Sequence, residues 1–310
     1  MALNCLDSAH GETWSAYNGD SCDILPQLPN DAVDFSIYSP PFGDLFVYSE
    51  SANDLGNSAN DAEFFEHYKF LIREKLRVTK PGRLSAVHCS DLPARKWKEG
   101  FVGTKPFSDD ITQAHIDAGW VFCRRITIWR DPVVEMTRTK ALNLLHKQIL
   151  KDSTKSWPGM ADYVLLFRKP GENASPVGHH KTEFPVDQWQ KWASPVWFDI
   201  SQTAVLNNKA EASKWIGDPI MLDDAREDDD EKHLCPLQLP LIERAQIMWS
   251  NPGDVVLSPF LGIGSEGVVA ARLKRKFIGI ELKASYWRQA CRALASAERN
   301  AVDLFAGAAE

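Results

Sequence analysis

The chain has 310 residues, of which 44% are hydrophobic and 25% are charged, and its formal net charge is −7. This composition is typical of a globular protein with one large domain or two smaller ones. No apolar run approaches the roughly 18 residues of a membrane span, and we find no secretory signal at the start, so we expect a cytoplasmic protein without membrane contact. Six scattered cysteines form no CxxC pair, which argues against a disulfide framework or a metal site.

Charge is distributed unevenly along the chain. Residues 223–232 carry seven acids and two bases, and this run alone supplies −5 of the −7. By contrast, residues 124–155 hold eight Lys or Arg and three Asp or Glu. A local basic stripe is what a phosphate backbone requires, although a solvated helix face is an equally good interpretation of this stripe taken alone.

The first half of the chain alternates strand and helix patterns. After a turn at Asn18-Gly19 we expect a short helix near 21–28 and a buried strand at 33–37. Residues 43–60 have the composition of a loop, and residues 61–82 have apolar side chains at helical spacing that end at a Pro-Gly pair. Strand patterns at 83–91, 121–130 and 162–171, with a helix at 111–120, then predict an α/β fold with a largely parallel sheet.

This alternation lapses between residues 170 and 232, which are rich in Trp, Pro, Asn and Asp. We interpret this segment as an insertion outside the sheet, between one half at 1–169 and another at 233–310. Trp189, Trp192 and Trp197 fall close together in it, and they could form recognition contacts or a small satellite core. A helix at 235–254 and a strand–turn–helix–strand–helix pattern complete the second half.

A glycine turn lies in that second half. Gly262, Gly264 and Gly267 match G-x-G-x-x-G, follow a strand at 255–257 and open a helix. The next strand ends at Glu281, whose carboxylate can accept hydrogen bonds from two ribose hydroxyls. Glycines let a backbone approach a ligand, and a helix N-terminus attracts negative charge. The pattern therefore predicts a nucleotide-like cofactor, NAD included.

The tetrapeptide Ser39-Pro40-Pro41-Phe42 directly follows the first buried strand. Two prolines cannot continue a sheet ladder, so they hold the next ring rigidly beyond the strand. An enzyme that modifies a base has a use for this tip, because it must stack an extruded base and hydrogen-bond its exocyclic amino group. Phe42 can stack, and the Ser39 hydroxyl and Pro40 carbonyl can accept from the amino group.

With these two motifs, the chain resembles the DNA amino-methyltransferases. "SPPF" is similar to their [D/N/S]-PP-[Y/F/W] catalytic motif, and "LSPFLGIGSEG" to their methyl-donor motif, in the order of the β group. The resemblance implies a Rossmann-like S-adenosylmethionine-dependent methyltransferase fold, with helices on both faces of a mixed, mostly parallel sheet and target recognition at 170–232. It also implies a homodimer that methylates double-stranded DNA and associates with the nucleoid, and it is closest to bacterial and phage enzymes without a restriction partner.

The resemblance assigns roles to three groups of residues. The catalytic residues would be Ser39, Pro40, Pro41 and Phe42. The methyl donor would be held by Asp20, Ser258, Phe260, Gly262, Gly264, Ser265 and Glu281. The candidates for phosphate contact are Arg138, Lys140, His146 and Lys147, each of which could equally be a plain surface residue.

Two serines depart from the commonest family pattern. Ser39 stands where many adenine-N6 enzymes carry Asp, and serine there is commoner in cytosine-N4 enzymes, while Ser258 stands where Asp is usual. We favour adenine-N6 methylation on overall resemblance, with cytosine-N4 as the alternative. Two other classes stay open at this point: a nicotinamide dehydrogenase that uses the glycine turn, and a DNA-binding relative that has lost catalysis.

Overall fold

The computed structural model describes residues 3–41, 61–94, 96–139, 142–217 and 236–306. Within these ranges, one nine-stranded sheet has the order β1-β2-β11-β10-β3-β4-β8-β7-β9. Its strands are β1 (Asp7–His10), β2 (Trp14–Asn18), β3 (Val33–Tyr38), β4 (Thr79–Ser90), β7 (Val121–Ile128), β8 (Asp162–Arg168), β9 (Val196–Trp197), β10 (Val255–Ser258) and β11 (Lys276–Glu281).

The sheet is mixed but mostly parallel. Parallel pairing runs without a break from β2 through β11, β10 and β3 to β4. β1 pairs antiparallel with β2, and β8 lies antiparallel between β4 and β7. Only β1 and β8 therefore run against the other strands of this sheet, and the prediction of a mixed, mostly parallel sheet is confirmed.

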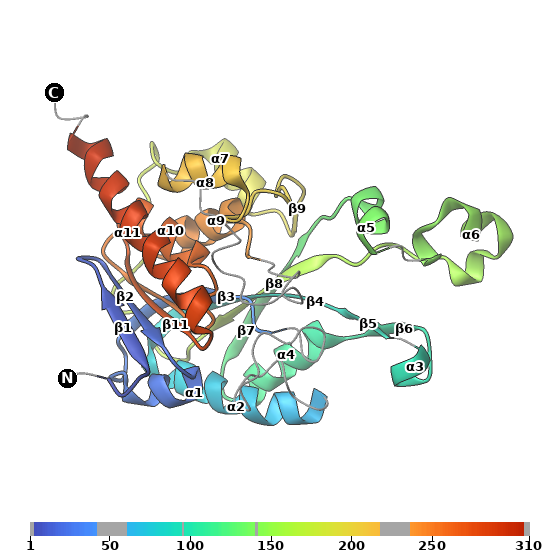
Figure 1. Ribbon diagram of the computed structural model, residues 1–310, viewed down its shortest axis with the longest axis horizontal. Helices are drawn as coiled ribbons and strands as arrows, with labels where there is room; N and C mark the ends of the chain where they lie inside the picture. Colours follow the sequence, from blue (N-terminus) through green and yellow to red (C-terminus); the bar gives the residue numbers. More distant parts are fainter. Residues whose placement is uncertain (1–2, 42–60, 95, 140–141, 218–235, 307–310) are drawn as a thin grey trace.

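Helices cover both faces of the sheet, so the central strands are buried on both sides (Figure 1). One face packs against α8 (Lys209–Ile216), α9 (Leu239–Trp249), α10 (Ser265–Arg272) and α11 (Ala284–Ala306). The other packs against α1 (Ser21–Ile24), α2 (Asp61–Val78) and α4 (Phe107–Asp117). Each face has its own hydrophobic core, and Phe35 and Tyr38 on the central strand β3 belong to different ones.

The helix predicted over residues 61–82 is shorter than expected. α2 ends at Val78, and Thr79 already begins β4. Pro81 and Gly82 therefore lie inside a strand, where the β3–β4 register shifts between Val33 and Phe35. A proline disfavours helical geometry in the residue before it and cannot donate to a ladder, so this irregular stretch accommodates it.

The segment 170–232 is not wholly outside the sheet. Val196 and Trp197 form β9, which pairs parallel with β7 at the edge of the sheet. Trp197 is 1% exposed and belongs to the larger core, so the prediction that the whole segment lies outside the sheet is wrong. Trp189, in α7 (Val186–Trp192), is by contrast 54% exposed. The boundaries of this insertion remain a prediction.

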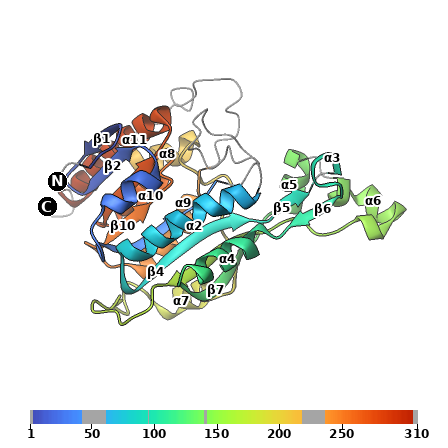
Figure 2. The ribbon, with the colours of Figure 1, turned by 90° about the horizontal axis from the view of Figure 1, so that it is seen from below.

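Two arms extend from one edge of the sheet (Figures 1 and 2). The β5–β6 arm continues β4 and consists of β5 (Leu92–Ala94), α3 (Lys96–Glu99) and β6 (Gly103–Lys105). The α5–α6 arm follows the end of β7 and consists of α5 (Pro132–Thr139) and α6 (His146–Lys151). Because β4 and β7 run in the same direction, both arms leave from the carboxyl edge of the parallel strands.

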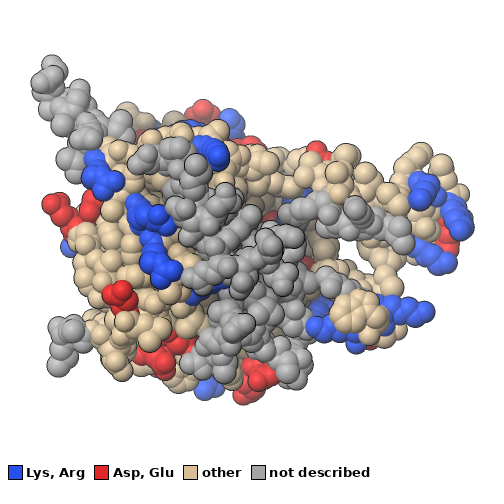
Figure 3. All heavy atoms as spheres, viewed as in Figure 1, with Lys and Arg blue, Asp and Glu red and all other residues tan. Residues whose placement is uncertain are grey.

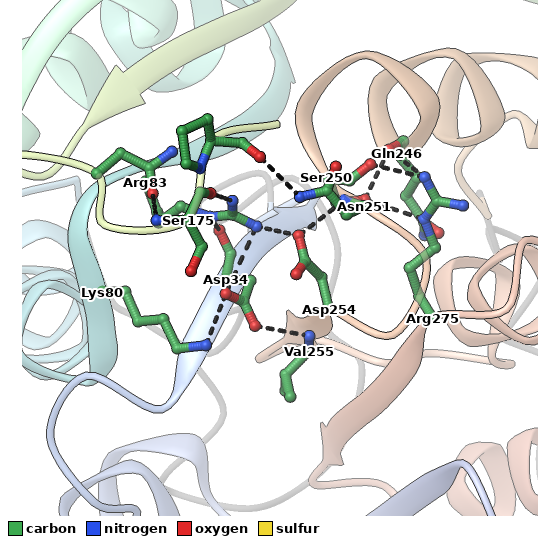
Figure 4. Close-up of polar contacts among 12 residues, drawn as sticks. Asp34, Lys80, Arg83, Ser175, Gln246, Ser250, Asn251, Asp254, Val255 and Arg275 are labelled. Atoms are coloured by element: carbon green, nitrogen blue, oxygen red, sulfur yellow. Dashed lines mark hydrogen bonds and ion pairs between the residues drawn. The ribbon is translucent and has the colours of Figure 1, made fainter. Parts of the chain in front are cut away.

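The opposite edge of the sheet is closed by an ionic cluster around Arg83 of β4 (Figure 4). The Arg83 guanidinium donates to the backbone carbonyl oxygens of Asp34 and Ser175, each at 2.9 Å, and to the carboxylate of Asp254. The Asp34 carboxylate accepts from the Val255 N–H at 2.9 Å and from Lys80 Nζ at 2.7 Å. This cluster joins the starts of β3 and β10, the two neighbouring strands that come from the two halves of the chain.

Candidate active site

The site lies where the order of the sheet reverses. From β3 the chain moves through α2 to β4 on one side, and from β10 it moves through α10 to β11 on the other. β3 and β10 are neighbours, so their carboxyl ends diverge at a topological switch point, where ligands bind in open α/β sheets. The two sequence motifs follow these two strands directly, so the structure brings Ser39 and the glycine turn to one edge.

The predicted catalytic motif begins at the end of β3. Ser39 is half-buried, Pro40 is buried and Pro41 is half-buried, while Phe42 lies outside the described residues. The Ser39 Oγ lies 2.8 Å from Nδ1 of His88, near the end of β4. Tyr38, just before Ser39, has its ring centroid 5.7 Å from that of Phe260, which follows β10. The aromatic residue of the predicted donor motif therefore packs against the strand that leads to Ser39.

The glycine turn follows β10 and leads into α10. Gly262 has a φ of +55°, which disfavours a side chain, and a Cβ there would meet no atom within 4 Å. Gly264 is the N-cap of α10, ahead of Ser265. At Gly267 a Cβ would fall 2.3 Å from Leu294 Cδ2, so this glycine allows α10 and α11 to pack closely. Gly262 thus leaves one side of the turn open, while Gly264 and Gly267 allow α10 to lie close to Ala290 and Leu294 of α11.

Glu281 ends β11 and holds the glycine turn in place. Its Oε2 accepts from the Gly262 N–H at 2.7 Å, and its Oε1 accepts from the Lys283 N–H at 2.9 Å. Each carboxylate oxygen has two lone pairs, so a carboxylate can accept several hydrogen bonds at once. Asp20 follows the adjacent strand β2 and caps α1 by accepting from the Cys22 N–H at 2.8 Å. Two carboxylates therefore lie at the ends of neighbouring strands beside the turn.

Burial has left two hydroxyls of the donor motif without hydrogen bonds. Ser258 and Ser265 are 0% and 2% exposed, and their Oγ atoms have no hydrogen-bond partner among the described residues. Buried polar groups are seldom left unsatisfied unless they have a ligand or water to bind. Together with the open side of Gly262, these hydroxyls fit a bound polar cofactor.

The protonation state of Glu266, in the first turn of α10, was not anticipated from the sequence. Glu266 is 4% exposed, and burial raises the pKa of its carboxyl to about 8, with the nearby Glu281 adding to the shift. Its backbone carbonyl accepts from Gln246 Nε2 at 2.8 Å. The first turn of α10 therefore holds a largely protonated acid at neutral pH, which reduces the repulsion of Glu281.

The residues predicted to contact phosphate lie on the α5–α6 arm. His146 and Lys147 are exposed on α6, while the Arg138 side chain and Lys140 lie outside the described residues. Figure 3 shows Lys and Arg side chains on the outer ends of both arms, with a hollow between the arms. The sequence analysis missed the β5–β6 arm, which has the exposed residues Lys96, Trp97 and Lys98. The mixture of basic and apolar residues in 95–105 could have indicated this arm as a second candidate for phosphate contact.

His88, Asp162 and Arg130 were also missed at the catalytic edge. His88 Nε2 lies 3.6 Å from Asp162 Oδ2, and an Arg130 guanidinium nitrogen lies 3.0 Å from Asp162 Oδ1. No motif links these residues in the sequence, because the pairing of β4 with β8 brings them together. In the part of the chain that the structure describes, no group of three metal-ligating side chains occurs, and no helix is both long and apolar enough to cross a membrane.

The fold and the site together define a doubly wound α/β enzyme with a nucleotide-type cofactor turn beside a serine-proline tip. A family model for DNA methylases matches residues 33–292, which include both motifs. The chain therefore belongs to this DNA methylase family, and the dehydrogenase alternative is wrong.

Known proteins of this family resemble the chain over most of its length. The DNA adenine methyltransferase YhdJ of Escherichia coli K12 is 41% identical over 307 residues, covering 95% of this chain and 87% of YhdJ. The type II methyltransferase M1.MboII of Moraxella bovis is 43% identical over 271 residues, covering 86% and 91%. The type II methyltransferase M.BglII of Bacillus subtilis is 25% identical, and the chain spans only 66% of its length.

Solved structures share the fold at lower identity. TTHA0409 from Thermus thermophilus, in complex with S-adenosyl-L-methionine, has a TM-score of 0.64 at 20% identity, covering 91% of this chain and 95% of that chain. The PvuII DNA methyltransferase, described as cytosine-N4-specific, has a TM-score of 0.62 at 19% identity, covering 95% and 92%. These neighbours confirm the predicted Rossmann-like methyltransferase fold.

Proposed function

We propose that this protein is a site-specific DNA methyltransferase that moves a methyl group from S-adenosylmethionine to the exocyclic amino nitrogen of an extruded base, with adenine N6 as the favoured target. The observation that supports this most directly is the position of Ser39 beside the glycine turn. The two motifs end adjacent parallel strands, β3 and β10, at the switch point of the sheet. A base and a methyl donor bound there would face each other.

The donor side is assigned to the residues around the glycine turn. Glu281 would accept from the ribose hydroxyls, and the unsatisfied Ser258 and Ser265 hydroxyls would bind the polar groups of the amino acid part. Phe260 and the open face of Gly262 would border the cofactor. When bound, S-adenosylmethionine supplies an activated methyl group on a sulfonium. Asp20 would lie at the far side of the same pocket.

The acceptor side is the rigid tip after β3. The amino group of a paired base cannot reach this edge within a duplex, so the target base must be flipped out. Ser39 Oγ and the Pro40 carbonyl would accept from the two amino hydrogens, and Phe42 would stack on the ring. Most of the rate would come from holding the nitrogen in line with the methyl group, a contribution of roughly 7–11 kcal/mol when the geometry is good.

DNA would lie between the two arms. Both arms leave from the carboxyl edge that carries Ser39, and both end in basic side chains (Figure 3). Lys147 on one arm and Lys96 and Lys98 on the other are exposed. Such contacts to phosphate would position the duplex without reading its sequence. Target recognition would then come from the 170–232 segment, where Trp189 and Phe198 are 54% and 66% exposed.

Adenine is favoured over cytosine by similarity to a protein with that stated specificity. YhdJ, described as a DNA adenine methyltransferase, is 41% identical over nearly the whole chain, whereas the cytosine-N4-specific PvuII enzyme is 19% identical. Ser39 is compatible with both bases, because a hydroxyl can accept from either amino group. Cytosine-N4 methylation is therefore the second candidate.

Nucleoside mass spectrometry tests the proposal. The protein is incubated with mixed-sequence duplex DNA and S-adenosylmethionine carrying a deuterated methyl group, and the DNA is then digested to nucleosides. We expect labelled N6-methyl-2′-deoxyadenosine, and its loss in Ser39→Ala but not in His10→Ala, since His10 is an exposed residue of the edge strand β1. Labelled N4-methyl-2′-deoxycytidine would establish the second candidate. No labelled nucleoside would indicate a DNA-binding relative without catalysis.

The predicted homodimer and nucleoid association are part of the same proposal. Light scattering after gel filtration, with and without a DNA duplex, measures the molar mass and so tests the homodimer. A monomer under both conditions contradicts the dimer without affecting the proposed reaction.

A further inference from the structure

The Ser39 hydroxyl does not lie alone at the acceptor site. Tyr38 pairs with Val87 in the parallel β3–β4 ladder, so the next residues, Ser39 and His88, are side by side. Ser39 Oγ and His88 Nδ1 are 2.8 Å apart, within hydrogen-bond distance. His88 is only 7% exposed. A buried imidazole is therefore the direct partner of the catalytic hydroxyl.

A carboxylate lies on the far side of that imidazole. Asp162 begins β8 and is 3% exposed, and its Oδ2 lies 3.6 Å from His88 Nε2. Arg130, which follows β7, lies 3.0 Å from the other oxygen. Burial on its own would raise the pKa of Asp162, but the contacts with His88 and Arg130 outweigh it and hold the pKa below its usual value. Asp162 is therefore ionised at neutral pH.

The charge of Asp162 fixes the hydrogen on His88. A carboxylate can only accept, so the imidazole nitrogen that faces it, Nε2, carries the hydrogen. Among the described residues Nε2 has no hydrogen-bond partner, and its 3.6 Å distance to Asp162 exceeds a hydrogen bond by a few tenths of an ångström. Such bonds are often long before the substrate binds and shorten in the reacting complex. Nδ1 is then unprotonated and accepts from the Ser39 hydroxyl.

We propose that His88, held by Asp162, is a positioning residue that converts Ser39 into an effective acceptor for the amino group of the target base. With its own hydrogen donated to His88, the Ser39 oxygen directs its lone pairs at the amino hydrogens. The three residues thus compensate for the carboxylate that is absent at position 39. This inference rests on the proposed function and adds the residues that allow a serine to serve it.

The same contacts give the released proton a route. As the amino nitrogen bonds to the methyl carbon, the carbon–sulfur bond breaks and its electron pair stays on sulfur. The nitrogen then bears a positive charge and gives one hydrogen to Ser39 Oγ, while the original Ser39 hydrogen passes to His88 Nδ1. The imidazolium that forms faces the Asp162 carboxylate and later loses its proton to solvent. No oxidant, metal or covalent intermediate is needed.

Two substitutions at His88 separate orientation from proton acceptance. His88→Ala removes both, and we expect a single-turnover rate lower by about 10²–10³-fold with unchanged S-adenosylmethionine affinity. His88→Asn keeps an acceptor near the position of Nδ1 but is too weak a base to take up the proton, so it should lose less rate than His88→Ala. His10→Ala, at an exposed histidine, is the matched control and should behave as wild type. A wild-type rate in His88→Ala, or a rate in His88→Asn as low as that of His88→Ala, overturns the inference.

A rescue test distinguishes this role from a purely structural one. Ser39→Asp places a carboxylate at the acceptor position and removes the need for His88, so adding His88→Ala to it should change the rate less than threefold. An equally large loss in both backgrounds shows that His88 only supports the fold. Nitrogen-15 NMR of the histidines in the unliganded protein gives an independent answer, because we expect the Nε2–H form of His88, and the Nδ1–H form contradicts us. If wild type methylates nothing, the proposed function fails while the NMR result still decides the histidine contacts.

Discussion

Replacing Arg83 with methionine should lower the free energy of unfolding by about 3–5 kcal/mol, the usual cost of removing one partner from a buried ionic cluster. Arg83 is 2% exposed and donates to two backbone carbonyls and to Asp254, while Asp34 Oδ1 lies 3.5 Å away. Methionine fills similar volume but leaves the Asp254 carboxylate without its guanidinium. Two lost hydrogen bonds to carbonyls contribute roughly 1 kcal/mol each to this figure.

Lys80→Met is the matched control for this prediction. Lys80 contacts the same Asp34 carboxylate at 2.7 Å, but its side chain is 41% exposed, so its loss should cost less than about 1 kcal/mol. Urea unfolding followed by circular dichroism measures both changes. Adding Asp254→Asn to Arg83→Met should recover part of the loss, because most of it is the uncompensated charge. If Arg83→Met lowers the free energy of unfolding by less than about 1 kcal/mol, the reasoning is refuted, because water must then solvate the Asp254 carboxylate in place of the guanidinium.

Three further predictions concern the site. Burial raises the pKa of Glu266 to about 8, so the free energy of unfolding of wild type is undiminished by this group below pH 4.5 and falls as the pH rises through about 8. Relative to wild type, the free energy of unfolding of Glu266→Gln should therefore increase by on the order of 4 kcal/mol between pH 4.5 and 9. The same pH dependence of the melting temperature in both proteins would contradict this. Glu281→Gln should weaken S-adenosylmethionine binding about 10–100-fold by calorimetry, with unchanged affinity as the contrary result. Phe42→Ala should retain donor binding and lose most turnover, and an equally active variant argues against base stacking.

Much of the fold could be predicted because its central strands are short apolar runs bounded by turn residues. The strands predicted at 33–37 and 255–257 each lie within one residue of β3 and β10, and the strand predicted to end at Glu281 is β11. Their order along the chain and the two motifs that follow them were sufficient to place the site at one edge. The helix-to-strand change at Val78 was not predicted, because Pro81 and Gly82 read as a stop signal and lie instead in an irregular part of β4.

What could not be predicted depends on pairing between distant strands. β9 is only two residues long, and nothing in its sequence distinguishes it from a loop. The Ser39–His88–Asp162 contacts exist because β4 pairs with β3 on one side and with β8 on the other. The spacing of apolar residues within one strand does not predict which residues of distant strands pair with it. The Arg83 cluster is hidden for the same reason, since Asp34 and Val255 are 221 residues apart.

The pairing of β3 with β10 also has a consequence for folding during synthesis, because the two strands are made far apart in time. β3 is the middle of the sheet, yet one of its two neighbours leaves the ribosome only after more than 200 further residues have been made. Until then its open edge, followed by the serine-proline tip, presents unpaired N–H and C=O groups, the kind of surface that promotes association of nascent chains. A chain that ends at residue 250 should therefore aggregate more readily than the full chain.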